Sequence, residues 1–261
     1  MTALAGLCVL NPRPAAQSAA LNDALRAAGA EVWALPLLDI EVLPATPEDE
    51  AMIADLDRCD GIVVVSANAA RALLSRVAER WPQWPSGIAL LAVGRATAQV
   101  LADAGLSVQV PSQEDSEGLL ALPRLQQVAG QRWLLARGEG GRELLAETLH
   151  ARGAQVLPLA LYRRVLPDAA AGAWSQRTRL PDVVLLSSAL VWSHWQQVAG
   201  DQACRPCLVT VSARLAEQVR AAGAGEVVNA GGASPEHWLE ALQHWRCQAA
   251  HGIQSDQNSS A

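Results

Sequence analysis

The two halves of this chain repeat one another. Glycine, arginine, leucine and serine positions recur about 120 residues apart, a spacing far longer than the roughly 20–50-residue period of a solenoid. The aligned pairs are Gly6 with Gly130, Arg13 with Arg137, Leu25 with Leu149, Gly29 with Gly153, Ser66 with Ser187, Gly94 with Ser212, and Ser116 with Ser234. We therefore expect two similar domains of about 100–150 residues each, with a ligand cleft between them.

Each half alternates apolar runs with stretches of helical periodicity. The run 61–65 is continuously apolar and rich in β-branched residues, which is typical of a buried parallel strand, and we expect a second strand over 182–186. Ser66 directly follows the first run and predicts the N-cap of a helix over 67–80. The alternation of strand and helix predicts an α/β fold with two similar doubly wound parallel sheets.

Further boundaries follow from the same patterns. We expect a helix over 142–152, a strand over 155–159, and a helix that is capped by Ser116 and ends near Leu125. The polar segment 248–261 ends in Ser-Asp-Gln-Asn-Ser-Ser-Ala, and we expect it to be disordered.

Composition excludes several classes of function. The net charge is −6 and no basic run exists, so we expect no nucleic-acid partner. All 20 basic residues are arginine, which excludes a lysine Schiff base and a P-loop lysine. No apolar run approaches the roughly 18 residues of a membrane span, and we find no secretory signal. The five cysteines lack a disulfide spacing, so we predict reduced thiols in the cytoplasm.

Cofactor motifs are incomplete. The sequence Gly-Glu-Gly-Gly at 138–141 approaches the dinucleotide fingerprint, but Glu143 stands where the third glycine belongs. Cys204 and Cys207 have redox spacing but no second pair, and His237 and His244 lack a third ligand. We therefore expect neither a metal nor a cofactor.

Polar residues recur where strands end and helices begin. In doubly wound sheets, ligands bind beyond the carboxyl ends of the strands. Each hydroxyl by itself is more typical of a helix cap than of a ligand site. As a set, the hydroxyls, arginines and helix N-termini suit a polyanionic ligand. The residues in question are Arg13, Ser66, Thr97, Ser116, Arg137, Ser187, Ser212 and Ser234.

Six short motifs, taken in order, resemble those of uroporphyrinogen-III synthases. They are Val-Leu-Asn-Pro-Arg-Pro at 9–14, Val-Val-Val-Ser-Ala-Asn at 63–68, Ala-Val-Gly-Arg-Ala-Thr-Ala at 92–98, Ser-Glu-Gly-Leu-Leu at 116–120, Leu-Leu-Ala-Arg-Gly at 134–138 and Leu-Tyr-Arg at 161–163. The resemblance implies an interleaved architecture. Residues 1–38 plus 168–247 would form one domain and residues 44–162 the other, joined by extended crossovers at 39–43 and 163–167. The residues alone also permit two sequential domains.

The resemblance further implies cyclisation of hydroxymethylbilane. The reaction loses water, passes through a spiro intermediate and inverts ring D, with no metal or cofactor. Tyr162 is the candidate donor to the leaving hydroxyl. The expected substrate contacts are Arg13, Ser66, Arg95, Thr97, Ser116, Arg137, Gly138, Ser187 and Ser212. A monomer is expected, and the resemblance allows a transient hand-over from hydroxymethylbilane synthase.

The sequence departs from the family at one point. Leu215 stands in the second half where many members carry threonine, and Ser212 could supply a hydroxyl instead. Two other classes remain as alternatives. A two-domain protein that binds a small anion without catalysis usually has an export signal, and a nucleotide-dependent transferase needs the phosphate loop and lysine that are missing here.

Overall fold

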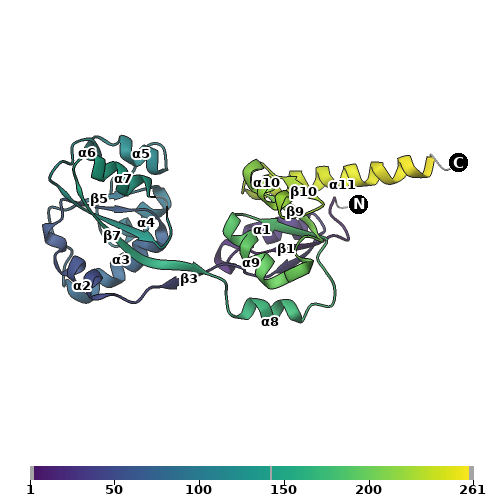
Figure 1. Cartoon of the computed structure of the whole chain (residues 1–261), viewed down its shortest axis with the longest axis horizontal. Coiled ribbons are helices and arrows are strands. Elements are labelled where there is room, and N and C mark those ends of the chain that lie inside the picture. Colours follow the sequence, from purple (N-terminus) through teal and green to yellow (C-terminus); the bar gives the residue numbers. More distant parts are fainter. Residues whose placement is uncertain (1–2, 142, 259–261) are drawn as a thin grey trace. The chain divides into compact units, whose positions relative to one another are not determined.

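The chain forms two compact units in the computed structural model, which describes residues 3–141 and 143–258, with side chains up to 248 (Figure 1). Unit 1 comprises Met1–Asp39 and Val165–Ala261, and unit 2 comprises Ile40–Arg164. Each unit contains one five-stranded sheet. The α/β class with two parallel sheets is thereby confirmed.

The sheet of unit 1 has the strand order β10-β9-β8-β1-β2. Its strands are β1 (Cys8–Asn11), β2 (Glu31–Ala34), β8 (Val183–Leu186), β9 (Cys207–Thr210) and β10 (Val227–Asn229), and every pairing is parallel. The helices are α1 (Ala15–Ala27), α8 (Ala169–Ser175), α9 (Ala189–Ala199), α10 (Ala213–Ala221) and α11 (Pro235–Asn258), with a 3-10 turn at Gly200–Gln202. Successive strand residues pack on opposite faces, so Val9 and Leu10 enter different core clusters.

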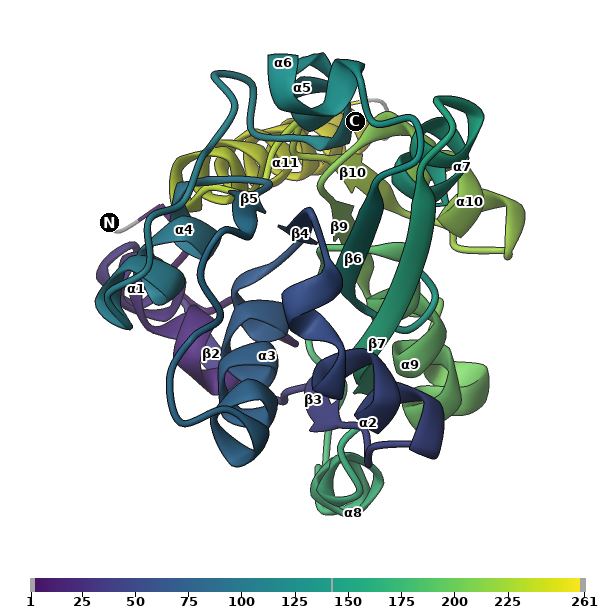
Figure 2. The same cartoon turned by 90° about the vertical axis from the view of Figure 1, so that its left-hand side faces the viewer.

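The sheet of unit 2 has the order β3-β7-β6-β4-β5. Its strands are β3 (Asp39–Val42), β4 (Gly61–Val64), β5 (Ala89–Ala92), β6 (Arg132–Gly138) and β7 (Gln155–Val165). The helices are α2 (Pro47–Ala54), α3 (Ala67–Arg80), α4 (Arg95–Asp103), α5 (Ser116–Ala121), α6 (Pro123–Gln126) and α7 (Leu144–Ala151), with a 3-10 turn at Leu56–Arg58. The core clusters place α2, α3 and α4 on one face, and α5, α6 and α7 on the other (Figure 2).

The sequence repeat reflects helix ends as well as strands. Gly29 follows α1 with φ +94°, and Gly153 follows α7 with φ +84°. The backbone N–H of each donates to the carbonyl three residues earlier, at Arg26 and His150 respectively. An L side chain is strained at such a φ, so glycine is retained at both copies for a backbone reason.

Strand β7 is longer than we expected. The predicted strand 155–159 continues to Val165, and therefore includes most of the crossover expected at 163–167. The crossover expected at 39–43 likewise contains β3, which neighbours β7 in the sheet. Just beyond β3, the backbone N–H of Leu43 donates to the Leu161 carbonyl at 3.0 Å. Pairing with each other satisfies backbone groups that free linkers would expose to water.

Other expected boundaries also change. Asp115, not Ser116, caps α5, because its carboxylate accepts from the backbone N–H of Gly118 at 2.7 Å. The helix expected to reach Leu125 is interrupted, because Leu122 is extended before Pro123. The helix expected over 142–152 begins at Leu144, and Arg142 lies outside the described residues.

The serine after β8 and the C-terminal segment differ as well. Ser188, whose hydroxyl accepts from the N–H of Val191, caps α9 and is the true counterpart of Ser66, so the alignment of Ser66 with Ser187 is wrong by one residue. Helix α11 continues to Asn258, so the tail expected to be disordered over 248–261 is helical as far as the structure describes it. In the described part of the chain, no helix is both long and apolar enough to cross a membrane.

The glycine at the end of α7 yields a stability prediction. Gly153→Ala should lower the free energy of unfolding by about 1–2 kcal/mol, the cost of left-handed backbone with a Cβ. The new Cβ would also lie 3.2 Å from that of Ala129. Urea denaturation measures the effect. Gly172→Ala is the matched control: Gly172 lies inside α8 with free space for a Cβ, so alanine should stabilise there by about 0.5–1 kcal/mol. Equal effects of the two substitutions would contradict the backbone explanation.

Candidate functional site

A cavity of about 170 Å³ opens at the carboxyl ends of β4 and β6 in unit 2. Strands β4 and β6 pair in register, with Val64 opposite Ala136, so the residues that follow both strands reach the same edge. Five of the expected site residues line this cavity: Ser66, Ser116, Arg137, Gly138 and Tyr162. The lining also includes Arg164, which our sequence analysis missed.

Tyr162 presents its hydroxyl to Ser66. The tyrosine is only 2% exposed, and its oxygen lies 3.0 Å from the Ser66 hydroxyl oxygen. The Ser66 oxygen also accepts from the N–H of Ala69 at 3.1 Å, as the N-cap of α3. Arg164 donates from Nη2 to the phenol oxygen at 3.3 Å. A buried phenol with two polar neighbours is thus held at the wall of the cavity.

Gly138 makes room for the Tyr162 ring. A Cβ at position 138 would lie 2.6 Å from Cζ of the ring and 2.9 Å from its hydroxyl oxygen, which is closer than real contacts allow. The β6–β7 register also shifts between Arg137 and Gly138, so Gly138 pairs directly with Tyr162. Such irregularities re-aim side chains at functional sites. The structure therefore gives Gly138 a packing role toward the candidate catalytic tyrosine.

Arg137 already holds a carboxylate. Its guanidinium donates to both carboxylate oxygens of Glu143, at 3.0 and 2.6 Å. The Arg137 side chain is 13% exposed and that of Glu143 55%. This hydrogen bonding raises the pKa of Arg137 and lowers the pKa of Glu143. The geometry defines a bidentate carboxylate site whose present occupant is an exposed side chain of the same chain.

Arg95 and Thr97 lie on α4 and do not line the cavity. Glu114 covers the start of this helix: its carboxylate accepts from the backbone N–H of Arg95 at 2.9 Å and lies 3.1 Å from Nε of the same residue. Thr97 is 4% exposed, as is Leu215 at the same position of α10, where it packs in the core of unit 1. Because Thr97 and Leu215 are both buried, we interpret this repeated helix position as one that packs in the core.

Three expected contacts belong to unit 1. Arg13 donates from Nη2 to the Ala233 carbonyl at 2.6 Å, and burial lowers the pKa of its guanidinium. Ser212 caps α10 by accepting from the N–H of Leu215 at 3.4 Å. Ser187 follows β8 and is partly exposed. None of the three lines the cavity in unit 2.

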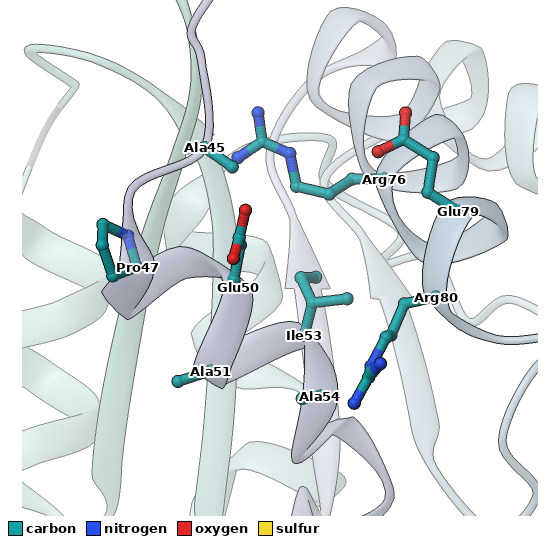
Figure 3. A pocket seen from close by; sticks show the side chains of 9 residues that line it. All are labelled: Ala45, Pro47, Glu50, Ala51, Ile53, Ala54, Arg76, Glu79 and Arg80. Atoms are coloured by element: carbon teal, nitrogen blue, oxygen red, sulfur yellow. The ribbon is translucent and has the colours of Figure 1, made fainter.

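A larger cavity, of about 470 Å³, lies between α2 and α3 (Figure 3). Its charged lining is balanced, with two glutamates, Glu50 and Glu79, and two arginines, Arg76 and Arg80. Arg76 is already anchored, since Nη2 donates to the Leu43 carbonyl at 2.6 Å. No strand end contributes to this cavity, so we place the site at Tyr162. Within residues 3–141 and 143–248, no cluster of histidine, cysteine and acidic side chains could hold a metal ion.

Comparisons with known proteins concern the chain as a whole. The family profile "Uroporphyrinogen-III synthase HemD" matches residues 19–240. The chain is 36% identical to the uroporphyrinogen-III synthase of Salmonella typhimurium and 33% identical to that of Escherichia coli; in each case the match covers 91% of this chain and the whole relative.

Solved structures support the fold. A mutant uroporphyrinogen III synthase from Thermus thermophilus superposes with a TM-score of 0.56 at 18% identity, covering 96% of this chain and 100% of that one. The Helicobacter pylori uroporphyrinogen-III synthetase gives 0.55 at 14% identity, covering 90% and 97%. At these identities the likeness concerns architecture.

The contact between Gly138 and Tyr162 can be tested spectroscopically. Tyr162 is the single tyrosine of the chain, so ring-labelled tyrosine gives one assigned NMR signal. Gly138→Ala should shift or broaden that signal, because the new methyl must displace the ring. Gly141→Ala is the control: Gly141 lines the same cavity, but its Cβ would meet only the Gly138 carbonyl, at 3.7 Å. An unmoved signal in Gly138→Ala would refute the packing role.

Proposed function

This chain belongs to the uroporphyrinogen-III synthase family, and on that premise we propose that it converts hydroxymethylbilane to uroporphyrinogen III. The single observation that carries the site assignment is the buried Tyr162 hydroxyl, held by Ser66 and Arg164 at a cavity on the strand ends. The direct test is incubation with hydroxymethylbilane and separation of the porphyrin isomers after oxidation. Isomer I alone, at the spontaneous rate, would contradict the proposal and favour a binding protein without catalysis.

The first chemical step needs a proton donor. We propose that the Tyr162 O–H gives its proton to the terminal hydroxyl of the substrate. The C–O bond then breaks with both electrons on oxygen, water leaves, and an azafulvene cation remains beside the tyrosinate. The last pyrrole attacks through its substituted carbon to give the spiro intermediate, which fragments and recloses. Reclosure releases one proton, which returns to Tyr162 and restores the enzyme.

The cavity is small relative to a tetrapyrrole. Pockets that enclose drug-sized ligands have volumes of about 300–1,000 Å³, whereas this cavity has about 170 Å³. We infer that it receives the reacting end of the substrate and that the other rings lie outside it. Holding the reacting ends together is the larger part of the task, because orientation alone can be worth about 7–11 kcal/mol.

The substrate carboxylates need cationic or N–H donors. Arg137 and the N-terminus of α4 already bind carboxylates, namely those of Glu143 and Glu114. An acetate or propionate group has the same donor requirement, and we propose that it replaces these glutamates. Arg13, Ser66, Ser116, Ser187 and Ser212 remain proposed contacts for further polar groups of the substrate.

The state of the cysteines bears on the cellular compartment of the enzyme. None of the five cysteines, all of which lie among the described residues, forms a disulfide, and burial raises the pKa of Cys8 to about 11 and of Cys207 to about 12. Such thiols are inert and suit a reducing compartment. We propose a cytoplasmic monomer that works without metal or cofactor and receives its unstable substrate by transient hand-over from hydroxymethylbilane synthase.

Removal of the phenol hydroxyl should slow the reaction selectively. Tyr162→Phe should lower kcat about 10²–10³-fold, the usual loss for one buried donor aimed at developing charge. The ring still fills the space over Gly138, so the melting temperature should change little. Steady-state kinetics with isomer analysis measure the effect. Unchanged formation of isomer III would remove Tyr162 from the mechanism.

Removal of the Glu143 carboxylate, which occupies Arg137, should improve substrate binding. Glu143→Gln frees Arg137 for a substrate carboxylate, so the Michaelis constant should fall by up to about fivefold, the range expected for an exposed ion pair. Glu147→Gln on the same helix is the matched control, since it removes the same charge without touching Arg137. A fall of equal size in both variants would indicate a general charge effect and contradict the competition.

A further inference from the structure

We propose that Arg164 is a positioning residue that directs the Tyr162 proton into the cavity and stabilises the phenol oxygen as that proton leaves. The inference rests on the proposed function and adds to it a residue that none of the motifs contains. Arg164 is exposed at the mouth of the cavity, and its Nη2 lies 3.3 Å from the phenol oxygen. Its guanidinium carbon lies 5.6 Å from the centre of the Tyr162 ring.

The strand places Arg164 on the correct side. Residues two apart in a strand project to the same face, so Arg164 shares a face with Tyr162, and Arg163 points to the other. Arg163 is neutralised there by Glu41, with two hydrogen bonds of 2.9 Å. No ion pair of Arg164 with a carboxylate occurs among the side chains that the structure describes. Its positive charge is therefore uncompensated beside the phenol.

Hydrogen-bond directions decide where the tyrosine proton points. A guanidinium only donates, so the phenol oxygen must accept from Arg164. The Ser66 oxygen already accepts from the N–H of Ala69, and its own proton is free to go to the phenol oxygen 3.0 Å away. When Ser66 is the donor of this hydrogen bond, both lone pairs of the phenol oxygen are used, and the phenol O–H is left to donate to a ligand in the cavity that all three side chains line.

The positive charge of Arg164 also favours transfer of the Tyr162 proton to the substrate. When Tyr162 gives its proton to the departing hydroxyl, negative charge grows on the phenol oxygen. Arg164 does not take part in the proton transfer, because its guanidinium stays protonated throughout. It lowers the cost of the transient tyrosinate by a charge-assisted hydrogen bond. When reclosure of the ring returns the proton, the original hydrogen bond is restored.

The alternative role is direct binding of a substrate carboxylate. The two roles differ in which kinetic parameter they change. A positioning residue acts through Tyr162 and affects kcat, whereas a carboxylate contact made in both ground and transition states affects the Michaelis constant. The effect of a positioning residue also disappears once the phenol hydroxyl is removed, because the two act as a unit.

The test is a double-mutant cycle in the full chain with hydroxymethylbilane as substrate. Arg164→Gln should lower kcat about tenfold with less than a twofold change in the Michaelis constant, a smaller loss than for a buried donor because water screens the exposed guanidinium. Arg164→Lys should restore part of kcat. In the Tyr162→Phe background, Arg164→Gln should cause no further loss. Arg163→Gln, which removes an adjacent charge on the opposite face, is the matched control and should leave kcat unchanged.

A second readout does not depend on activity. The single tyrosine ring signal should move in Arg164→Gln and stay in place in Arg163→Gln. Three results would overturn the proposal. Arg164→Gln could raise the Michaelis constant in both the wild-type and the Tyr162→Phe backgrounds, it could lower kcat by the same factor in both backgrounds, or it could leave the tyrosine signal unmoved. Wild-type protein that forms no isomer III would instead overturn the proposed function itself, while the tyrosine signal would still report whether Arg164 contacts Tyr162.

Discussion

Parallel pairing of β4, β6 and β7 is the constraint on which the site depends. Because the three strands run in the same direction, their carboxyl ends meet at one edge, and Ser66, Gly138 and Tyr162 come together although they are far apart in the sequence. The pairing is itself held by apolar burial on both faces. Ile62 and Val64 enter one core cluster, and Val63 the other. Neither set can shift register without exposing itself to water.

Close packing of aromatic rings against glycines fixes side chains along these strands, including one at the site. At the amino end of the β4–β6 pair, Gly61 faces Trp133, and a Cβ there would lie 2.3 Å from the indole ring. At the carboxyl end of the β6–β7 pair, Gly138 leaves space in the same way for the ring of Tyr162. Two large aromatic rings thus lie against two glycines along one sheet. The phenol is positioned by rigid backbone at its ring and by hydrogen bonds at its oxygen, which is the support a proton donor needs.

Electrostatics divides the arginines by function. Arg137 and Arg95 hold glutamate carboxylates at the strand ends, and Arg163 holds Glu41 on the opposite face of β7. Arg164 alone in this group is turned to an uncharged phenol. In a chain of net charge −6, a cation at the cavity mouth that forms an ion pair with none of the described carboxylates also favours the approach of an anionic substrate.

Local patterns in the amino-acid sequence were enough to predict the duplicated α/β architecture. Apolar strand segments and the glycines at helix ends recur in the same order in both halves of the chain. The same patterns placed Ser66 and Arg137 at strand ends, whereas Gly138 and Tyr162 were singled out by the resemblance to uroporphyrinogen-III synthases. Which of these residues meet depends on the folded chain. In the folded chain β7 extends to Val165, and Asp115 rather than Ser116 caps α5. Gly138 leaves space for the ring of Tyr162, 24 positions later in the sequence. Arg164 has no local signature, because its role arises from a strand direction and a neighbour across the sheet, and such contacts exist only after the chain has folded.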